Sequence, residues 1–152
     1  MSIIFVFTRI TPSDAIRVTA EPDAAWDLIE TPRSADEPSG DLDQAWDGLR
    51  CLFSAAAVDF DLLGGDEPST RQDCLRVWSA TEVSAAARVL SATPFDRLAE
   101  HFSPELMDEE GAGPDIWDGD EALDYLREAY EDLQAFFTHA AATNSAAMGQ
   151  FA

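Results

Sequence analysis

Three tryptophan–aspartate pairs are the residues whose types and spacing could do chemistry in this sequence. They are Trp26-Asp27, Trp46-Asp47 and Trp117-Asp118. An indole ring beside a carboxylate can receive a cation, or an arginine anchor from another protein, because both groups attract positive charge. Two of the carboxylates also have local explanations: Asp118 is placed to cap a helix, and Asp47 lies three residues before Arg50. These explanations favour a structural role, and a binding groove is the alternative.

The candidate binding residues are the aromatic and charged side chains of two of these pairs and their neighbourhoods. They are Trp46, Asp47, Arg50, Asp115, Trp117, Asp118 and Tyr125. We predict no catalytic residue and no cofactor, because the sequence has no nucleophile-elbow motif, no P-loop and no dinucleotide-binding glycine motif. His101 and His139 fall on helix flanks, where we expect them to be solvated or packed.

The many aspartates raise the question of a metal site. A calcium-binding EF-hand loop needs acidic or amide side chains at its first, third and fifth positions, glycine at the sixth and glutamate at the twelfth. A loop that starts at Asp59 places Thr70 at the twelfth position, and one that starts at Asp115 places Trp117 at the third. Neither histidine has a cysteine or histidine partner at zinc-ligand spacing. We therefore predict no metal site, with a weak cation site formed by Asp115, Asp118 and Asp120 as the alternative.

The charge is the most unusual property of the composition. The 152 residues include 30 acidic and 9 basic side chains, giving a formal charge of −21, and every basic residue is arginine. Such a field repels phosphate backbones, so we expect no nucleic-acid partner, and it speeds encounter with a basic protein. A GC-rich genome or a salty cytoplasm explains the same excess without any partner, and the composition does not decide between the two.

Length and hydropathy predict a single domain, residues 1–152, with a flexible loop at residues 31–40. Cys51 and Cys74 have the setting of small buried hydrophobes, and nothing marks a disulfide-stapled secreted scaffold. The first ten residues contain too short an apolar run for a signal peptide or a membrane span. We therefore expect a cytoplasmic protein without a membrane partner.

The long C-terminal helix is the element that must position the candidate residues. Apolar side chains at three- and four-residue intervals predict a helix from about Leu123 to Ala142. We expect Asp118 to be its N-cap, with Glu121 three residues on as in a capping box, and Asn144 to follow its C-terminus. This helix is long enough to be the packing partner of most other segments.

The remaining elements are shorter. A second helix is predicted over residues 41–57, capped by Asp41 or Asp43, and strands are predicted at residues 3–8, 75–78 and 146–152. The first strand is apolar on both faces, which is typical of a central strand. Thr11 or Ser13, and Ser79 or Thr81, are placed to cap further helices. Together the elements predict an α+β fold, with a small mixed sheet of about three strands packed with several helices and dominated by the long C-terminal helix.

Four segments of the chain form a pattern in a fixed order. They are TRITPSD after the first strand, LDQAWDGL at residues 42–49, FSPELM at residues 102–107, and IW followed by LDYL at residues 116–126. The pattern resembles the YfbM-like family of bacterial proteins, a domain of unknown function. Asp47 stands where the family commonly has histidine, and the segment at residues 146–151 is less strand-like than the family's ending. The resemblance implies an α+β fold and transfers no catalytic residue.

Three functional hypotheses follow. The first is a non-enzymatic protein-binding module, in its strongest form an immunity-type protein that neutralises a toxin by covering its basic cleft. The second is a small-ligand binder or an enzyme, with a pocket between the Trp46 helix and the Trp117 turn and a carboxylate of perturbed pKa. The third is an acid-rich housekeeping domain whose charge only keeps it soluble.

Overall fold

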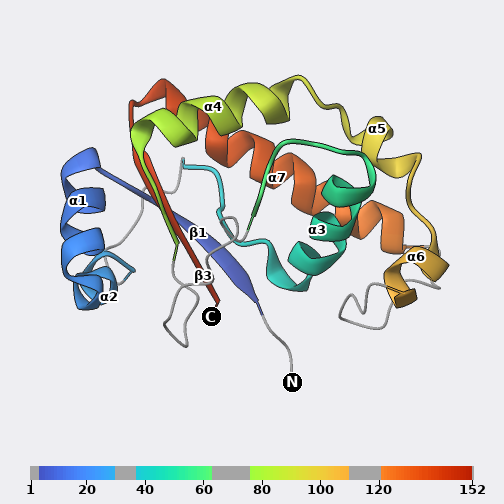
Figure 1. The fold of residues 1–152 in the computed structure, drawn as a ribbon, viewed down its shortest axis with the longest axis horizontal. Coiled ribbons are helices and arrows are strands. Elements are labelled where there is room, and N and C mark those ends of the chain that lie inside the picture. The colour runs from blue at the N-terminus through green and yellow to red at the C-terminus, as the bar shows by residue number, and fades with distance from the viewer. Residues whose placement is uncertain (1–3, 30–36, 63–75, 110–120, 152) are drawn as a thin grey trace.

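A three-stranded sheet separates two unequal sets of helices (Figure 1). The computed structural model describes residues 4–29, 37–62, 76–109 and 121–151. The strands are β1 (Phe5–Ile10), β2 (Arg76–Trp78) and β3 (Ala146–Phe151), and both strand pairings are antiparallel. The helices are α1 (Pro12–Ala20), α2 (Ala25–Ile29), α3 (Trp46–Ala55), α4 (Ala80–Ser91), α5 (Phe95–Ala99), α6 (Pro104–Glu109) and α7 (Ala122–Ala142), with 3₁₀ turns η1 (Pro22–Ala24) and η2 (Asp43–Ala45). The α+β class and the three strands are confirmed, but the sheet that they form is antiparallel and not mixed as predicted.

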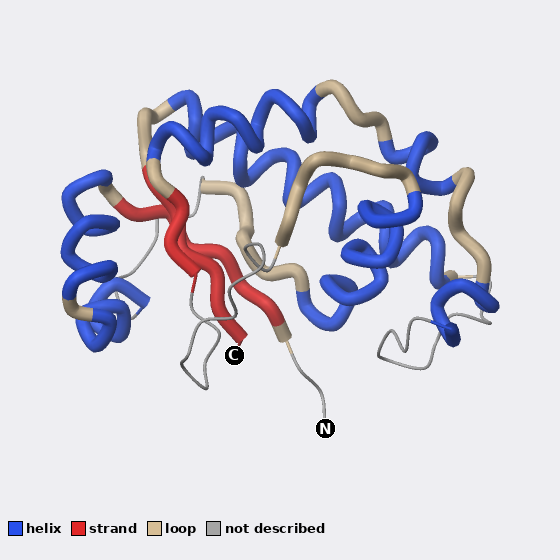
Figure 2. The backbone as a smooth tube through the Cα atoms, in the orientation of Figure 1, coloured by secondary structure: helices blue, strands red, loops and turns tan. Residues whose placement is uncertain are grey.

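The two faces of the sheet are covered very differently (Figure 2). Helices α1 and α2 lie on one side over a small core that includes Ile10, Val18 and Met148. Helices α3 to α7 lie on the other side, and the main core fills the space between them and the sheet. Within the described segments, no helix is both long enough and apolar enough to cross a membrane.

Helix α7 is the spine of the main core, as its periodicity predicts. Its 21 residues place Tyr130, Leu133 and Phe137 in full burial, and α4 packs alongside. The expected capping box is wrong: the helix begins at Ala122 with Glu121 at the N-cap, and the Glu121 side chain makes no capping hydrogen bond. Asp118 lies outside the described residues.

The C-terminus of α7 follows the prediction. Thr143 is the C-cap, and Asn144 adopts a left-handed φ of 53°. The Ser145 N–H donates to the Ala140 carbonyl at 2.8 Å, and the Asn144 N–H donates to the Ala141 carbonyl at 3.1 Å. These two bonds form a Schellman motif, which satisfies the last helical carbonyls and turns the chain into β3.

The central strand of the sheet is β3, and not β1 as its sequence predicts. β1 is apolar on both faces because helices cover both sides of the sheet, and this burial is independent of a strand's position within it. The outer edge of β1 is met by the chain near residue 40: the Phe7 N–H donates to the Gly40 carbonyl at 2.7 Å, and the Leu42 N–H donates to the Phe5 carbonyl at 2.9 Å.

The central strand, β3, contains several small residues, which leave room for the packing around it. Ala146 and Ala147 are fully buried, and a Cβ atom on Gly149 would lie 2.8 Å from Cζ of Phe5. The Phe7 ring, from the neighbouring strand, contacts Phe137 of α7 at a centroid distance of 5.2 Å. The aromatic side chains of its neighbours thus occupy the space above β3, and larger side chains on β3 would collide with them.

Candidate functional site

Trp46 begins α3 and forms part of the aromatic packing near the sheet. Its ring centroid lies 4.9 Å from that of Phe151 and 6.3 Å from that of Phe5. The residue is partly buried against the main core. This contact explains the tryptophan structurally, because an edge-to-face aromatic pair in a core stabilises by its area and by ring geometry.

Asp47 and Arg50 form the ion pair that their spacing predicts. Nε and Nη2 of Arg50 donate to Oδ1 of Asp47 at 2.8 Å and 2.6 Å. The Asp47 side chain is only 15% exposed, so it is more enclosed than a freely solvated surface carboxylate. The α3 helix itself begins later than expected, at Trp46, and neither Asp41 nor Asp43 caps it. Asp41 instead accepts the N–H of Asp43 at 2.8 Å, in a turn where Asp43 has a φ of 51°.

Tyr125 joins α7 to that turn across a large separation in sequence. Its hydroxyl oxygen accepts the backbone N–H of Gln44 at 3.1 Å. Burial, and then the negative charge of Asp43, raise the pKa of the Tyr125 phenol, although the hydrogen bond from Gln44 lowers it. The phenol is therefore neutral at physiological pH and remains a polar group next to carboxylates.

A pocket of about 320 Å³ opens beside Tyr125, between α7 and the chain that precedes α3. Four carboxylates line it, together with Ser39, Leu42 and Ala129; they are Asp41, Asp43, Glu128 and Asp132. No basic side chain is among the described residues of its wall. A hollow of this kind attracts positive charge, and its volume falls at the small end of ligand pockets, which are roughly 300–1,000 Å³.

Asp132 is the carboxylate of this wall whose pKa is displaced. Burial, and then the neighbouring charges of Glu128 and Glu131, raise the pKa of Asp132. Glu128 and Asp132 are four residues apart on one helix, where like charges repel. The described residues contain no group of three or more metal-ligand side chains arranged to hold a metal ion. The carboxylates of the wall attract an organic cation or a basic side chain, either of which needs less tightly converging oxygens than a metal.

The structure thus brings one candidate residue, Tyr125, into an acidic pocket, and places Trp46, Asp47 and Arg50 on the neighbouring helix outside its wall. The other candidates, Asp115, Trp117 and Asp118, lie outside the described residues, as does most of the loop at residues 31–40. Of the four carboxylates in the wall, sequence reasoning considered Asp41 and Asp43 only as helix caps, and it missed Glu128 and Asp132. Their spacing of three and seven from Tyr125 on a predicted helix was the available signal, since it places all three on one face.

The remaining tryptophan pair is at the surface. Trp26 of α2 is 55% exposed, and Oδ2 of Asp27 lies 3.5 Å from Nη2 of Arg17. Both side chains of this ion pair are well exposed, and such pairs contribute little to stability.

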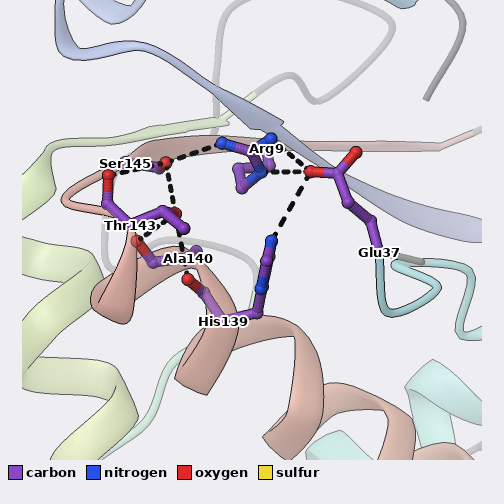
Figure 3. Close-up of polar contacts among 6 residues, drawn as sticks. All are labelled: Arg9, Glu37, His139, Ala140, Thr143 and Ser145. Carbon is purple, nitrogen blue, oxygen red and sulfur yellow. Dashed lines mark hydrogen bonds and ion pairs between the residues drawn. The ribbon is translucent and has the colours of Figure 1, made fainter. Parts of the chain in front are cut away.

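A polar cluster at the end of α7 was not predicted (Figure 3). Glu37 pairs with the Arg9 guanidinium, and its Oε1 lies 3.7 Å from Nε2 of His139. Nη1 of Arg9 also donates to the hydroxyl of Ser145 at 3.0 Å. The carboxylate partner of His139 therefore comes from the chain before α3, which no local pattern indicates. The cluster fastens that chain to β1 and to the end of α7. Among the described residues, the hydroxyl of Ser145 accepts from Arg9 and contacts that of Thr143, which also donates to the carbonyls of His139 and Ala140.

Comparison with known proteins agrees with this fold. Residues 1–149 match the model of a family described as a domain of unknown function, DUF1877. The crystal structure of YfbM from Escherichia coli, a protein of unknown function, superposes with a TM-score of 0.69 over 100% of both chains at 15% sequence identity. No curated protein matches the chain. At that identity the structural likeness shows a shared fold, and the family match over nearly the whole sequence shows that this chain belongs to the DUF1877 family, whose YfbM-like fold it adopts.

Proposed function

We propose that this protein is a non-enzymatic binding module for a basic protein, in its most concrete form an immunity-type protein that covers the basic cleft of a toxin. The observation that carries the proposal is the pocket beside Tyr125, whose wall holds four carboxylates and, among the described residues, no basic group. An arginine or lysine from a partner would there meet several carboxylates and the neutral phenol of Tyr125.

The charge of the whole chain supports the same partner. With a formal charge of −21, the protein attracts a basic surface over long distances and accelerates encounter with it. The same field disfavours nucleic acid. Charge at a rim mainly changes the association rate, whereas a basic anchor enclosed in the pocket changes the dissociation rate.

The test begins with the gene neighbourhood, which is read for a secreted toxin whose basic domain is then titrated against the protein. The pocket variant replaces its carboxylates by isosteric amides: Asp41→Asn, Asp43→Asn, Glu128→Gln and Asp132→Asn. Asparagine keeps an acceptor at residue 41 and tolerates the left-handed backbone at residue 43. We expect the pocket variant to bind at least roughly tenfold more weakly than the wild-type protein.

The matched control removes the same number of charges outside the wall of the pocket. Its substitutions fall on four exposed residues, one at the C-cap of α5 and three in α6: Glu100→Gln, Glu105→Gln, Asp108→Asn and Glu109→Gln. Both variants have the same formal charge, so a difference between them reports the pocket and not the overall field. The proposal fails if no neighbouring toxin binds, or if the two variants bind it equally.

The second candidate function is a small-ligand binder, and the volume of the same pocket favours it. About 320 Å³ holds a small organic cation. The original form of this hypothesis places the pocket between Trp46 and Trp117, and Trp117 lies outside the described residues. Titration with spermidine, followed through the NMR signals of Tyr125, separates the two: saturable binding that the pocket variant abolishes and the control variant keeps supports a ligand site.

A further inference from the structure

The hydrogen bonds at the outer edge of β1 determine, for every strand of the sheet, which residues direct their N–H and C=O toward which neighbour. The N–H of Phe7 and the carbonyl of Phe5 bond to Gly40 and Leu42, on the side away from β3. In an antiparallel ladder the N–H and C=O of one residue point to the same side, and the side alternates from residue to residue. Phe7 therefore makes no ladder bonds with Gly149, its partner on β3.

The same alternation of hydrogen-bonding directions continues through β3 to β2. Because Gly149 does not bond to β1, its polar groups face β2, where its partner is Arg76. Val77 is the next residue, opposite Met148, so its N–H and C=O must face away from β3, toward the outer edge of β2. Within the described part of the chain, neither group of Val77 has a backbone partner outside the sheet.

An apolar groove runs beside the outer edge of β2, on the side of the sheet that α1 covers. Its volume is about 520 Å³, and its walls include Ala15, Ile16 and Ala20 of α1 together with Val77 and Ala80. Ile16 is 73% exposed, one of two large apolar side chains so exposed among the described residues. Glu82, at the start of α4, contributes the single charge of the described lining.

If a strand from another molecule paired with β2, one of its residues would contact both the edge of the sheet and the groove. A residue that exchanges both hydrogen bonds with Val77 lies directly opposite it, and opposed side chains project from the same face of a sheet. Its side chain would therefore enter the groove between Val77 and Ile16. From this coincidence we propose that the β2 edge and the α1 groove bind an extended peptide segment of a partner protein, by strand addition to β2.

The chemistry of the segment follows from the surroundings. Side chains at alternate positions are apolar, because they face the groove, and basic residues flank them, because the chain carries a charge of −21. Glu82 itself already pairs with Arg76 of β2 at 3.3 Å. The charge also disfavours a second copy of this chain, since two strongly acidic molecules would have to pair edge to edge.

This proposal does not depend on the proposed function. The groove lies at the β2 edge, whereas the pocket beside Tyr125 involves residues 39–43, which adjoin the outer edge of β1. One surface can fail its test while the other passes.

The experiment titrates the full chain with a panel of synthetic peptides, Lys-Ile-Thr-Xaa-Thr-Ile-Arg, whose central residue is Leu, Ile, Val or Phe. Amide exchange of Val77 is followed by NMR. We expect at least one member to bind and to slow exchange of the Val77 N–H. N-methylation of the central residue removes the N–H that would donate to the Val77 carbonyl and keeps every side chain, so it should weaken binding roughly tenfold or more.

Two variants test the side-chain half of the proposal. Ile16→Asp places a charge in the groove at a solvent-exposed position, where folding is little affected, and should weaken binding roughly tenfold. Trp26→Asn removes the other exposed large apolar residue and should leave binding unchanged, because Trp26 does not line the groove. Ile16→Asp should also leave the toxin titration unchanged.

Three results would overturn the proposal. One is that no peptide of the panel binds, and another is that the methylated and unmethylated peptides bind equally well. The third is that the protein dimerises and Ile16→Asp dissolves the dimer, which would assign the edge to a second copy of the chain. Sedimentation of the free protein decides that last case.

Discussion

At the scale of single residues, the most deeply buried polar side chain of α7 is Tyr130. Its hydroxyl donates to the Thr93 carbonyl at 2.7 Å and lies 3.3 Å from the Leu90 carbonyl. Burial raises the pKa of Tyr130 from 10.0 to about 12. The unfolded chain ionises first as pH rises, so the folded state loses stability between about pH 10 and pH 12, by roughly 1.4 kcal/mol per pH unit.

The substitution Tyr130→Phe should remove most of this alkaline loss. At pH 8 it should cost about 1 kcal/mol, because the hydroxyl bond is lost while Nε2 of Gln134 still donates to both carbonyls. Denaturant unfolding measured from pH 8 to about pH 11.5 gives both numbers. Parallel profiles for the two proteins would show that Tyr130 is not the group that titrates.

Neutralising Asp132 should stabilise the protein, in contrast to Tyr130→Phe. The pKa of Asp132 is raised in the folded state, so the ionised side chain destabilises that state. Asp132→Asn should stabilise the protein at pH 7 by about 0.3 kcal/mol, the size of a like-charge pair on a helix, and this gain should fade below pH 4, where the folded and unfolded chains are both protonated. Asp124→Asn should instead destabilise, because Asp124 lies in the first turn of α7. Thermal unfolding at the two pH values checks both signs, and equal signs would refute the reasoning.

Contacts between residues close in the sequence could be predicted from it, and contacts between residues far apart in the sequence could not. Thr11 caps α1 by accepting the Asp14 N–H at 3.0 Å, and Ser79 caps α4, each being one of the two alternatives predicted for its helix. The full capping box between Ser79 and Glu82 was not predicted. The bond between Gln44 and Tyr125 joins residues 81 positions apart. A cap depends on a few neighbouring residues, whereas such a contact depends on how whole elements are packed.

At the scale of elements, the sheet shows where periodicity is insufficient. The residue pattern predicted three strands but placed β1 at the centre, because apolar residues on both faces are usual for central strands. The centre belongs to β3, whose Ala146, Ala147 and Gly149 have weak strand propensity. The small size of Ala147 and Gly149 matters only once the aromatic rings of β1 and α7 are packed above them, and that of Ala146 only once α1 is packed on the other face.

A substitution at Gly40 tests how the chain before α3 is attached to the edge of β1. A Cβ atom there would lie 2.0 Å from the carbonyl oxygen of Phe7, a backbone atom held in β1, so the chain could not stay bonded to that edge. Gly40→Ala should destabilise the fold by about 2 kcal/mol or more and free the edge of β1. Urea unfolding measures the loss, and amide exchange at Phe7 should accelerate. A variant within about 0.5 kcal/mol of the wild type would show that the approach is looser than described.

At the scale of the whole molecule, the acid excess far outweighs the ion pairs. The described residues contain five arginine–carboxylate pairs, and the chain has 30 acidic residues for 9 arginines. Most carboxylates therefore have no arginine to neutralise them. The two proposed binding surfaces lie toward opposite edges of the sheet, so one molecule could hold a basic anchor beside α7 and an extended segment beside α1.

Added salt should stabilise this protein, in contrast to a protein whose surface charges are mostly paired. Screening the self-repulsion of a chain with a charge of −21 gains more than is lost from exposed ion pairs. We expect Tm to rise by about 2–4 °C, on the order of 1 kcal/mol, between roughly 0.01 M and 0.5 M NaCl, because the screening length falls from roughly 30 Å to a few ångströms. The two variants with four neutralised carboxylates should each show a smaller rise. A Tm that falls with salt would mean that attractive ion pairs dominate. Folding only in molar salt would indicate that the acidity is an adaptation to a salty host and not to a basic partner.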